Sequence, residues 1–536
     1  MKLIRPLPRA LTRSLSLLVL AAWALNMGAL VHRTRASGVA LGADLARYGS
    51  SAQWRGIYYR GDKIGFSVGQ TRPHGEGYEI REDGRLQMTL LGSPTAVRLT
   101  SVVEVDRAFN LRRFRFSLDP GTGATEVSGD LDGRRLRIAV HTPSGDRTEI
   151  RDLPEPPALA LNLPRSLAAR GLRPGQTHHV SVFDPATLHN APMTLKVQAR
   201  ELVRAAGRPV PAFRVEATFA GIVTRSWITD VGDVVREESP LGLIVVRETP
   251  ERAQALAVPG TIQTDLLEAA AIVPNPPRRI DDPTAVRRLR LRLEGAEAFA
   301  GPDLEGAGQT LAGAVIELRD ARELEAGPAE PDLSRYLAAE ALLESDAPEI
   351  RSEAEAALAG IREPRPRAER LVRHVHALLE KKPTLSIPSA LEVLRTRVGD
   401  CNEHTALYVA LARASGLPAR IAVGLVYLRG AFYYHAWPEV WVAERPGRGL
   451  WLPVDPTLNQ FPSDATHLRL ARGGLHKQAA ILALVGRARV RILDVELRPG
   501  ATPVLVGRPA SDLRPLALSL PRRDGGGRGC WSSPGR

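Results

Sequence analysis

One cysteine, one histidine and one aspartate stand in the last third of the chain in an order suited to nucleophilic chemistry. Cys401 is one of only two cysteines in 536 residues, and the other, Cys530, lies in the terminal stretch GGGRGCWSSPGR. His435 opens the segment HAWPEVWV, and Asp455 lies near the end of the segment LWLPVDP. A thiolate nucleophile needs a basic or cationic partner, and that partner needs a third group to fix its tautomer. The three residues therefore predict acyl transfer through a thiol.

The local sequence predicts that Cys401 lies at the start of a helix. Asp400 is a good N-cap residue, and Glu403 follows it at the spacing of a capping box. The pattern of ALYVALARASG continues the helix, and Gly416 and Pro418 end it. A cysteine in the first turn lies at the positive end of the helix dipole, where free N–H groups can hold a developing oxyanion. We therefore expect this setting to lower the pKa of the Cys401 thiol.

Strands must then bring the other two groups to this end of the helix. Three strand candidates follow it, namely ARIAVGLVYL, HAWPEVWV and LWLPVDP. Adjacent strands that carry His435 and Asp455 could place both side chains at one face, next to Cys401. Upstream, apolar residues recur at helical spacing in LSRYLAAEALLES, APEIRSEAEAALAGI and AERLVRHVHALLEKK, which predicts helices there.

These motifs closely resemble the transglutaminase-like superfamily, which has a papain-like cysteine fold. The matching pieces are GDCNEHTALYVALARASGLPAR, HAWPEVWV and WLPVDPT, and the resemblance covers about Ser334 to Gly474. It implies that Cys401 is the nucleophile, that His435 is the general base and acid, and that Asp455 orients His435. It also implies attack on a glutamine or peptide amide through a thioester, which water or an amine then resolves.

Other residues are expected to support or complete this site. Asp400 and Glu403 support it through the helix cap, and Trp437 is expected to wall the cleft. Cross-linking members of the family use an upstream tryptophan as oxyanion donor, but no tryptophan lies between Trp227 and Trp437 here. The second oxyanion donor is therefore unassigned. His404 is interpreted as a packing residue. We predict neither a cofactor nor a metal, and two cysteines cannot build a cysteine-based zinc site.

The first half of the chain predicts β structure. From Trp54 to Thr249, short segments alternate apolar and polar residues between Gly, Asp and Pro turns. Long meanders of this kind predict an antiparallel sheet that curls around an apolar face, as a curved sheet or half-barrel. The opening YYRGDKIGFSVGQT loosely resembles the half-barrel domains of bacterial envelope proteins that handle lipid or lipoprotein.

The predicted fold class is α+β, divided along the chain into six segments. These are a signal anchor or transmembrane helix at 1–36, a β-rich extracytoplasmic domain at 50–275, a small β segment or linker at 284–330, the transglutaminase-like domain at 334–475, a β segment at 476–506 and a disordered tail at 507–536. The Pro-rich stretch PNPPRRIDDP precedes the third segment, and the tail is rich in Pro, Gly and Arg.

The N-terminal segment predicts a location outside the cytoplasm. The run Ser14–Val31 has 18 residues without charge, preceded by four basic residues. As a helix it would be roughly 27 Å long, close to what a bilayer requires. The basic N-terminal flank predicts that the body is translocated. We expect a single-pass protein of a bacterial inner membrane with its body in the periplasm; the alternative is a periplasmic or secreted protein after signal cleavage.

The charge composition of the chain indicates which classes of binding partner to expect. The net charge is +13, and all but six of the 72 basic residues are arginines. They are scattered, with no basic stripe between aromatic residues, so we do not expect nucleic acid to be a partner. The oligomeric state stays open.

The leading hypothesis is an enzyme that attacks peptide or protein amides of the cell envelope. Hydrolysis is favoured over cross-linking because no site for an amine donor is legible. The alternative is a non-catalytic envelope scaffold or binding module with a relic transglutaminase-like domain. A third interpretation gives the β-rich half a role in binding the cell wall.

Overall fold

The computed structural model describes most of the chain between residues 52 and 506. The residues left out of that range are 91, 220, 241, 257–264, 266–267, 269, 296–298, 300–301, 385, 475, 478–480, 482–483, 485–486 and 501–504. The predicted N-terminal anchor at 1–36 and the predicted tail at 507–536 lie outside the described residues. Within the described part, no helix is both long enough and apolar enough to cross a bilayer.

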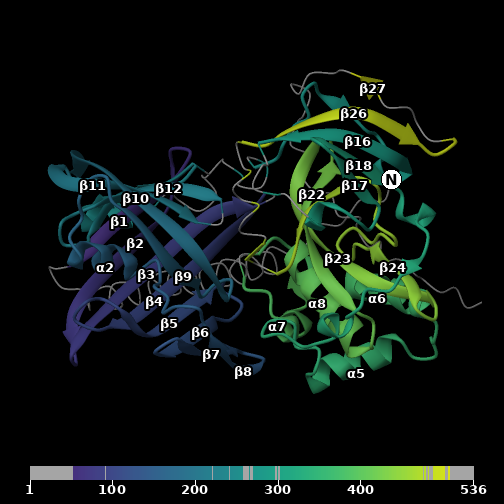
Figure 1. Ribbon diagram of the computed structural model, residues 1–536, viewed down its shortest axis with the longest axis horizontal. Helices are drawn as coiled ribbons and strands as arrows, with labels where there is room; N and C mark the ends of the chain where they lie inside the picture. Colours follow the sequence, from purple (N-terminus) through teal and green to yellow (C-terminus); the bar gives the residue numbers. More distant parts are fainter. Residues whose placement is uncertain are drawn as a thin grey trace, which may run out of the picture.

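A curled sheet of 14 strands takes up the first half of the chain (Figure 1). All neighbouring strands in it are antiparallel, and β1 pairs with both β2 and β14. One half of the sheet is the meander β1 to β8, with β1 Gln53–Tyr59, β2 Asp62–His74, β3 Gly77–Leu90, β4 Ser93–Val105, β5 Leu111–Asp119, β6 Thr125–Asp132, β7 Arg135–Thr142 and β8 Gly145–Asp152. The other half runs from β9 to β14, with β9 Thr177–Asp184, β10 His189–Ala205, β11 Arg208–Phe219, β12 Ile222–Ile228, β13 Val234–Glu238 and β14 Leu243–Glu248. The expected antiparallel half-barrel is confirmed.

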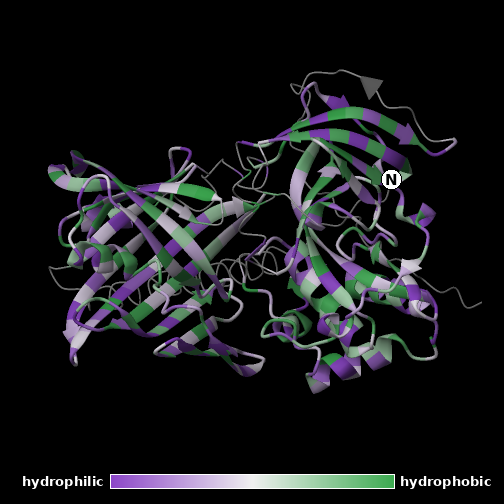
Figure 2. Cartoon of the chain, in the orientation of Figure 1, coloured by the Kyte–Doolittle hydropathy of each residue, from purple (hydrophilic) through white to green (hydrophobic). Residues whose placement is uncertain are grey.

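The period-two pattern of the strands explains the curl around an apolar interior. In β7, Leu136, Ile138 and Val140 are buried, whereas Arg135 and Arg137 between them are exposed. Successive side chains of a strand point to opposite faces, so one face of the sheet is apolar (Figure 2). Each fully buried Leu or Ile contributes about 1.5–3 kcal/mol. Two short helices, α2 (Leu163–Ala169) and α3 (Pro250–Gln254), pack against this sheet.

A four-stranded sheet joins two segments that are distant in sequence. Its order is β17-β18-β16-β26, with β16 Val286–Glu294, β17 Gln309–Ala312, β18 Val315–Arg319 and β26 Arg489–Leu497. The sequence pattern assigned these strands to separate segments, 284–330 and 476–506. Pairing of β16 with β26 brings them together, and sequence periodicity alone carries no sign of such a long-range pairing.

The region with the candidate site packs helices on a five-stranded sheet. The helices are α5 Pro348–Ala357, α6 Pro364–Leu378, α7 Ala390–Thr396 and α8 Cys401–Ala414. The sheet order is β19-β24-β23-β22-β25, with β19 Gly327–Pro328, β22 Ala419–Leu428, β23 Ala431–Arg445, β24 Arg448–Pro453 and β25 His467–Arg472. From Glu403 to Arg413, α8 is buried on all sides, since it lies between the other helices and the sheet. The three predicted strands and the helix that starts at Cys401 are confirmed.

One predicted helix is wrong. The segment LSRYLAAEALLES contains only a 3₁₀ turn, Ser334–Tyr336, followed by an isolated bridge between Glu340 and Leu343. Its apolar residues do not form one helical stripe; instead Ala341 and Leu342 pack against the apolar cluster of the 14-stranded sheet. The segment therefore fills the junction between the two regions.

Candidate active site

The first turn of α8 is built as the sequence predicts. The Asp400 carboxylate accepts the Asn402 N–H at 2.9 Å, and the Glu403 carboxylate accepts the Asp400 N–H at 2.8 Å. This capping box satisfies two of the N–H groups that a helix start leaves free. A Cβ at Gly399 would stand 2.2 Å from the Cβ of Glu403, so only glycine lets the cap close. Cys401 is thus fixed at the first position of the helix.

Helix α8 packs against the edge of β23 at Ala436, the residue after His435. The Thr405 hydroxyl donates to the Ala436 carbonyl at 3.1 Å, and the Ala436 N–H bonds to the Cys401 sulfur. Pairing between β23 and β24 begins only at Glu439, so the backbone of Ala436 is left for the helix. The sulfur therefore lies against the backbone of the strand that carries His435.

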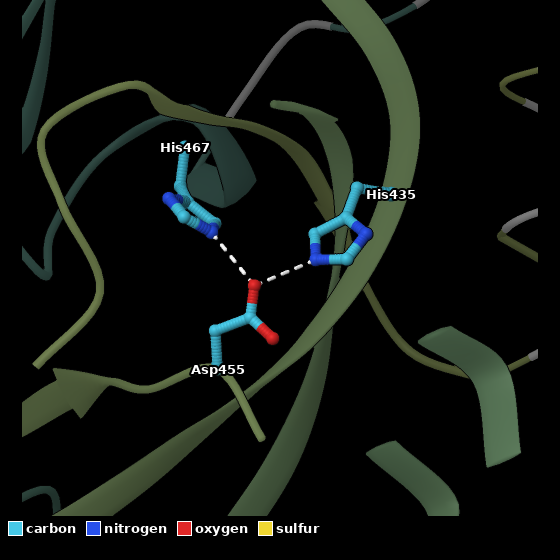
Figure 3. A group of neighbouring side chains, drawn as sticks. All are labelled: His435, Asp455 and His467. Atoms are coloured by element: carbon cyan, nitrogen blue, oxygen red, sulfur yellow. Dashed lines mark hydrogen bonds and ion pairs between the residues drawn. The ribbon is translucent and has the colours of Figure 1, made fainter. Parts of the chain in front are cut away.

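His435 and Asp455 form a buried pair (Figure 3). The His435 Nε2–H donates to Asp455 Oδ2 at 2.8 Å, and the other carboxylate oxygen accepts the Leu458 N–H at 2.9 Å. The Asp455 side chain has no exposed surface. Burial alone would raise its pKa, but His435 and a second imidazole outweigh burial and hold the pKa well below its usual range. Because Asp455 takes the proton on Nε2, the Nδ1 atom of His435 is left with a lone pair that can accept a proton.

The second imidazole is His467, which the sequence analysis missed. His467 Nε2 lies 3.0 Å from Asp455 Oδ2, and its Nδ1 lies 3.2 Å from a carboxylate oxygen of Asp464 (Figure 3). The contact depends on β25 pairing with β22, which places His467 opposite Val426. The only local signal was the Asp-x-x-His spacing in DATH, which begins nine residues after Asp455.

Trp437 packs against both imidazoles, whose rings lie 5.8 Å apart. Its ring lies 6.0 Å from that of His435 and 5.2 Å from that of His467, and it is 1% exposed. Trp437 is therefore a buried side chain in contact with both rings, and its expected role as a supporting residue that walls the cleft and the core stays a prediction.

The surroundings of Cys401 shift the pKa of its thiol in the direction opposite to the one expected. The helix start was expected to lower the thiol pKa, but burial and the carboxylates of Asp400 and Glu403 raise it well above its usual value. The Ala436 N–H opposes this shift without reversing it. In the part of the chain that the structure describes, no hydrogen bond joins the sulfur to His435. The thiol is therefore protonated at rest, and a thiol in this state would need a base to take its proton before it could act as a nucleophile.

Two buried polar atoms near the sulfur lack hydrogen-bond partners among the described residues. One is the hydroxyl of Tyr434, whose pKa is raised by burial and by the neighbouring Cys401. The other is Nε2 of His404, whose Nδ1 bonds to the Asp400 carbonyl at 2.6 Å. His404 is fully buried against the helix start, as a packing residue would be, and burial lowers its pKa.

The side chains of His435, Asp455 and His467 offer three atoms that a metal ion could bind. These atoms lie within 4.8 Å of one another. To bind a metal, both imidazoles would have to give up the protons that they donate to Asp455, since a ligand nitrogen must offer its lone pair. The described hydrogen bonds fit a carboxylate shared by two imidazoles.

Comparison with known proteins agrees with the fold of this region. The profile of the transglutaminase-like superfamily matches residues 352–456. Uncharacterized proteins of Mycobacterium tuberculosis (strain H37Rv) and Mycobacterium bovis are 35% identical over 91 residues, covering 15% of this chain and 29% of each relative. The chain thus spans less than a third of the length of these relatives.

Two solved structures each match less than half of the chain. A proposed cysteine protease from Cytophaga hutchinsonii is 18% identical, covers 40% of this chain and 86% of its own, and gives a TM-score of 0.25. A β-barrel-like protein of unknown function from Brucella abortus is 12% identical, covers 37% and 95%, and gives a TM-score of 0.30. The superfamily match shows that residues 352–456 form a transglutaminase-like domain. These residues begin within α5 and end just after Asp455.

Proposed function

We propose that the chain is a thiol-dependent acyl-transfer enzyme that attacks peptide or protein amide bonds. Cys401 is the nucleophile, His435 the general base and acid, and Asp455 the group that orients His435. One observation carries the proposal: the strand that bears His435, with its 2.8 Å buried bond to Asp455, packs through Ala436 against the helix whose capped start is Cys401. A base with a fixed tautomer beside such a cysteine is the arrangement that thiol acyl transfer needs.

The proton moves between the same two residues in each half of the reaction. His435 Nδ1 takes the proton of the Cys401 thiol, and the thiolate attacks the carbonyl carbon of the amide. The developing oxyanion lies near the N-terminal end of α8, where the helix dipole favours negative charge. His435 then gives its proton to the leaving nitrogen as the C–N bond breaks, which leaves a thioester.

The thioester is resolved by water in the proposed reaction. His435 takes a proton from the water as the oxygen attacks the thioester carbonyl, and it returns that proton to the sulfur as the C–S bond breaks. The products are a carboxylic acid and the restored thiol. We favour hydrolysis over transfer to an amine because the sequence offers no recognisable amine-donor site.

The direct test compares wild type with Cys401→Ala in an amidase assay on peptide and protein substrates. Loss of activity in the variant, by about 10³-fold or more, is expected for removal of a nucleophile. The variant Thr148→Ala is a matched control, since Thr148 is exposed on β8 of the 14-stranded sheet. Equal activity of wild type and Cys401→Ala would sink the proposal.

A second candidate function is a non-catalytic envelope scaffold or binding module, and one observation favours it. The raised pKa of the Cys401 thiol is what an unused, buried cysteine would show. The two functions differ in the pH dependence of alkylation at Cys401. An active site predicts rapid alkylation near neutral pH that slows in His435→Ala, whereas a scaffold predicts slow alkylation that is the same in both proteins.

We also propose that the enzyme works outside the cytoplasm, with its body in the periplasm and its N-terminal helix in the inner membrane. The uncharged run Ser14–Val31 with its basic flank supports this location. Protease treatment of spheroplasts should digest the body of the protein while cytoplasmic markers survive. Protection of the body until the cells are lysed would contradict the location, and release into the soluble periplasmic fraction would support signal cleavage instead.

A further inference from the structure

His467 is held between two buried carboxylates. Its Nε2 lies 3.0 Å from Asp455 Oδ2, and its Nδ1 lies 3.2 Å from both Oδ1 and the backbone carbonyl of Asp464. The His467 side chain is 2% exposed, and both carboxylates are equally hidden. Solvent therefore contributes little to the stability of any charge in this group.

The contacts decide how many protons His467 carries. A neutral imidazole has one N–H and one lone pair, and a lone pair facing a carboxylate oxygen would be repelled by it. Both ring nitrogens of His467 face acceptor oxygens, so both need a proton. Although burial by itself disfavours the charge, Asp464 and Asp455 outweigh burial and raise the pKa of His467 to about 10.

The partners of His467 are fixed in turn. Asp464 accepts from the Thr466 N–H at 2.9 Å and the Thr466 hydroxyl at 2.6 Å, and from the Gln460 amide at 2.8 Å. Asp455 exchanges backbone hydrogen bonds with Gln460 as well. The loop from 455 to 467 therefore forms one bonded unit beneath the His435 ring.

A count of charges shows what His467 contributes. Asp455 and Asp464 carry two negative charges, and protonated His467 cancels one of them. The unit becomes neutral when His435 takes its second proton. Without the charge on His467, the unit would carry two uncancelled negative charges, and the imidazolium of His435 would be stabilised more strongly. A base held that firmly in its protonated form would be slow to return the proton to a leaving group.

Other charged groups act on this unit from neighbouring elements. The Asp455 carboxylate favours a raised pKa for Lys381, in β20 (Glu380–Lys381), and for Cys401. The pKa of Lys381 is nevertheless lowered, because burial of its side chain outweighs this effect. Asp464 acts on Asp320, whose carboxylate also accepts a hydrogen bond from Arg498 Nε at 2.9 Å. None of these groups bonds to His467 within the described residues, so its two aspartates dominate its state.

We propose that His467 is a positioning residue, a permanent imidazolium that fixes Asp455 and sets how firmly His435 holds its proton. The proposal deepens the proposed function and rests on it. His467 lies beyond residues 352–456, the part that matches the transglutaminase-like profile. It acts through Asp455 and does not touch the reacting sulfur.

The first test uses the full-length wild-type chain. Histidine labelled with ¹³C and ¹⁵N reports by NMR whether each ring nitrogen carries a proton, and the His467 signals are assigned by their through-bond correlations to the backbone of residue 467. At pH 8 we expect two protonated nitrogens for His467 and a single protonated nitrogen for His435. A neutral His467 at pH 8 would overturn the proposal without any variant having to fold.

The second test uses two substitutions that change the charge near His435 in opposite directions. In His467→Gln the positive charge is lost, and the His435 titration should move up by about one pH unit. In Asp464→Asn a negative charge is lost, and the same titration should move down. His374→Gln is the matched control, since His374 bonds to Glu353 at 2.6 Å, between α6 and α5, and should leave His435 unchanged.

The outcomes separate this proposal from the proposed function. An unmoved His435 titration in either folded variant overturns the role of His467, whatever the enzyme does. If the His435 titration shifts as expected but Cys401→Ala is fully active, the role of the His467 charge is supported and the proposed enzyme function is contradicted. If His467→Gln does not fold, Asp464→Asn and the wild-type spectrum decide the matter.

Discussion

The two large regions of the molecule place their charges differently. In the 14-stranded sheet, charged pairs such as Arg113–Asp130 lie across neighbouring strands, with more than half of each side chain exposed. In the region of the candidate site, Glu439 has no exposed surface and bonds to three arginines, namely Arg420, Arg469 and Arg472. Exposed ion pairs contribute about 0–1 kcal/mol, whereas breaking a buried one costs several. The buried charges are therefore where single substitutions should have large effects.

The largest effect is expected from the buried aspartate of the candidate site. Asp455→Asn keeps the size of the side chain but removes the charge that fixes the His435 tautomer. We expect the rate of amide hydrolysis to fall by about 10³–10⁴-fold, as for other triads that lose this group. The measurement is kcat/KM on the substrate found with wild type, with thermal unfolding to check the fold. Activity within tenfold of wild type would show that Asp455 does not orient the base.

How far the sequence predicts this site depends on the range of each interaction. The helix cap at Asp400 and Glu403 and the strands that carry His435 and Asp455 follow from residues within a few positions of each other. His467 reaches Asp455 only through the pairing of β25 with β22, which no local pattern reveals.

The same reason explains what was missed in the fold. The curled sheet could be predicted because strand periodicity and turns are local. The segment LSRYLAAEALLES has helical spacing, but tertiary packing of Ala341 and Leu342 against the other region overrides it. The thiol pKa of Cys401 was also misjudged, because the depth of burial and the nearness of Asp400 depend on the folded surroundings.

The next largest effect tests the buried ion cluster directly. Burial would raise the pKa of Glu439, but the arginines outweigh burial and hold it well below its usual range. Glu439→Gln leaves Arg420 and Arg469 buried without their carboxylate, which should cost about 3–5 kcal/mol. The control is Glu126→Gln, which removes the partner of exposed Arg115 and should cost less than about 1 kcal/mol. Urea unfolding measures both, and equal costs would break the contrast between the two regions.

The buried unit around Asp455 also predicts how stability depends on pH. The folded-state pKa values of Asp455 and Asp464 are lowered, so their stabilisation is present above about pH 4 and is lost as pH falls through the folded pKa. The pKa of His467 is raised to about 10, so its stabilisation is complete below about pH 6.5 and is lost as pH rises toward 10.

The loss of stability at alkaline pH can be measured directly. One group with a raised pKa changes the free energy of unfolding by at most about 1.4 kcal/mol per pH unit. Between pH 7 and 9.5 the stability of wild type should fall with a slope of that order, and His467→Gln should flatten it. A parallel pH dependence in the two proteins would mean that His467 is not charged in the folded state. The exposed His141 on β7 offers the control, and His141→Gln should leave the alkaline slope as it is.

The smallest predicted effect lies at the junction of the two regions. The Ser144 hydroxyl donates to Glu392 of α7 at 2.6 Å, and Ile387, which precedes α7, is buried in the apolar cluster of the 14-stranded sheet. Ser144→Ala should therefore cost only about 1 kcal/mol, the net contribution of one hydrogen bond, because the apolar contact of Ile387 remains. Tryptophan fluorescence can follow both regions, since Trp54 lies in one and Trp441 in the other.

A single urea transition, shifted slightly in Ser144→Ala, would mean that the regions unfold together and that other contacts of the junction, such as those of Ile387, Ala341 and Leu342, supply most of their coupling. Two separate transitions in this variant would mean that the polar contact holds the regions together. The same result would weaken the contrast drawn above, because a half-buried hydrogen bond from the sheet would then matter as much as the buried charges of the site. Thr148→Ala, in the edge strand β8 that follows the turn with Ser144 but without the contact to α7, should not shift the transition.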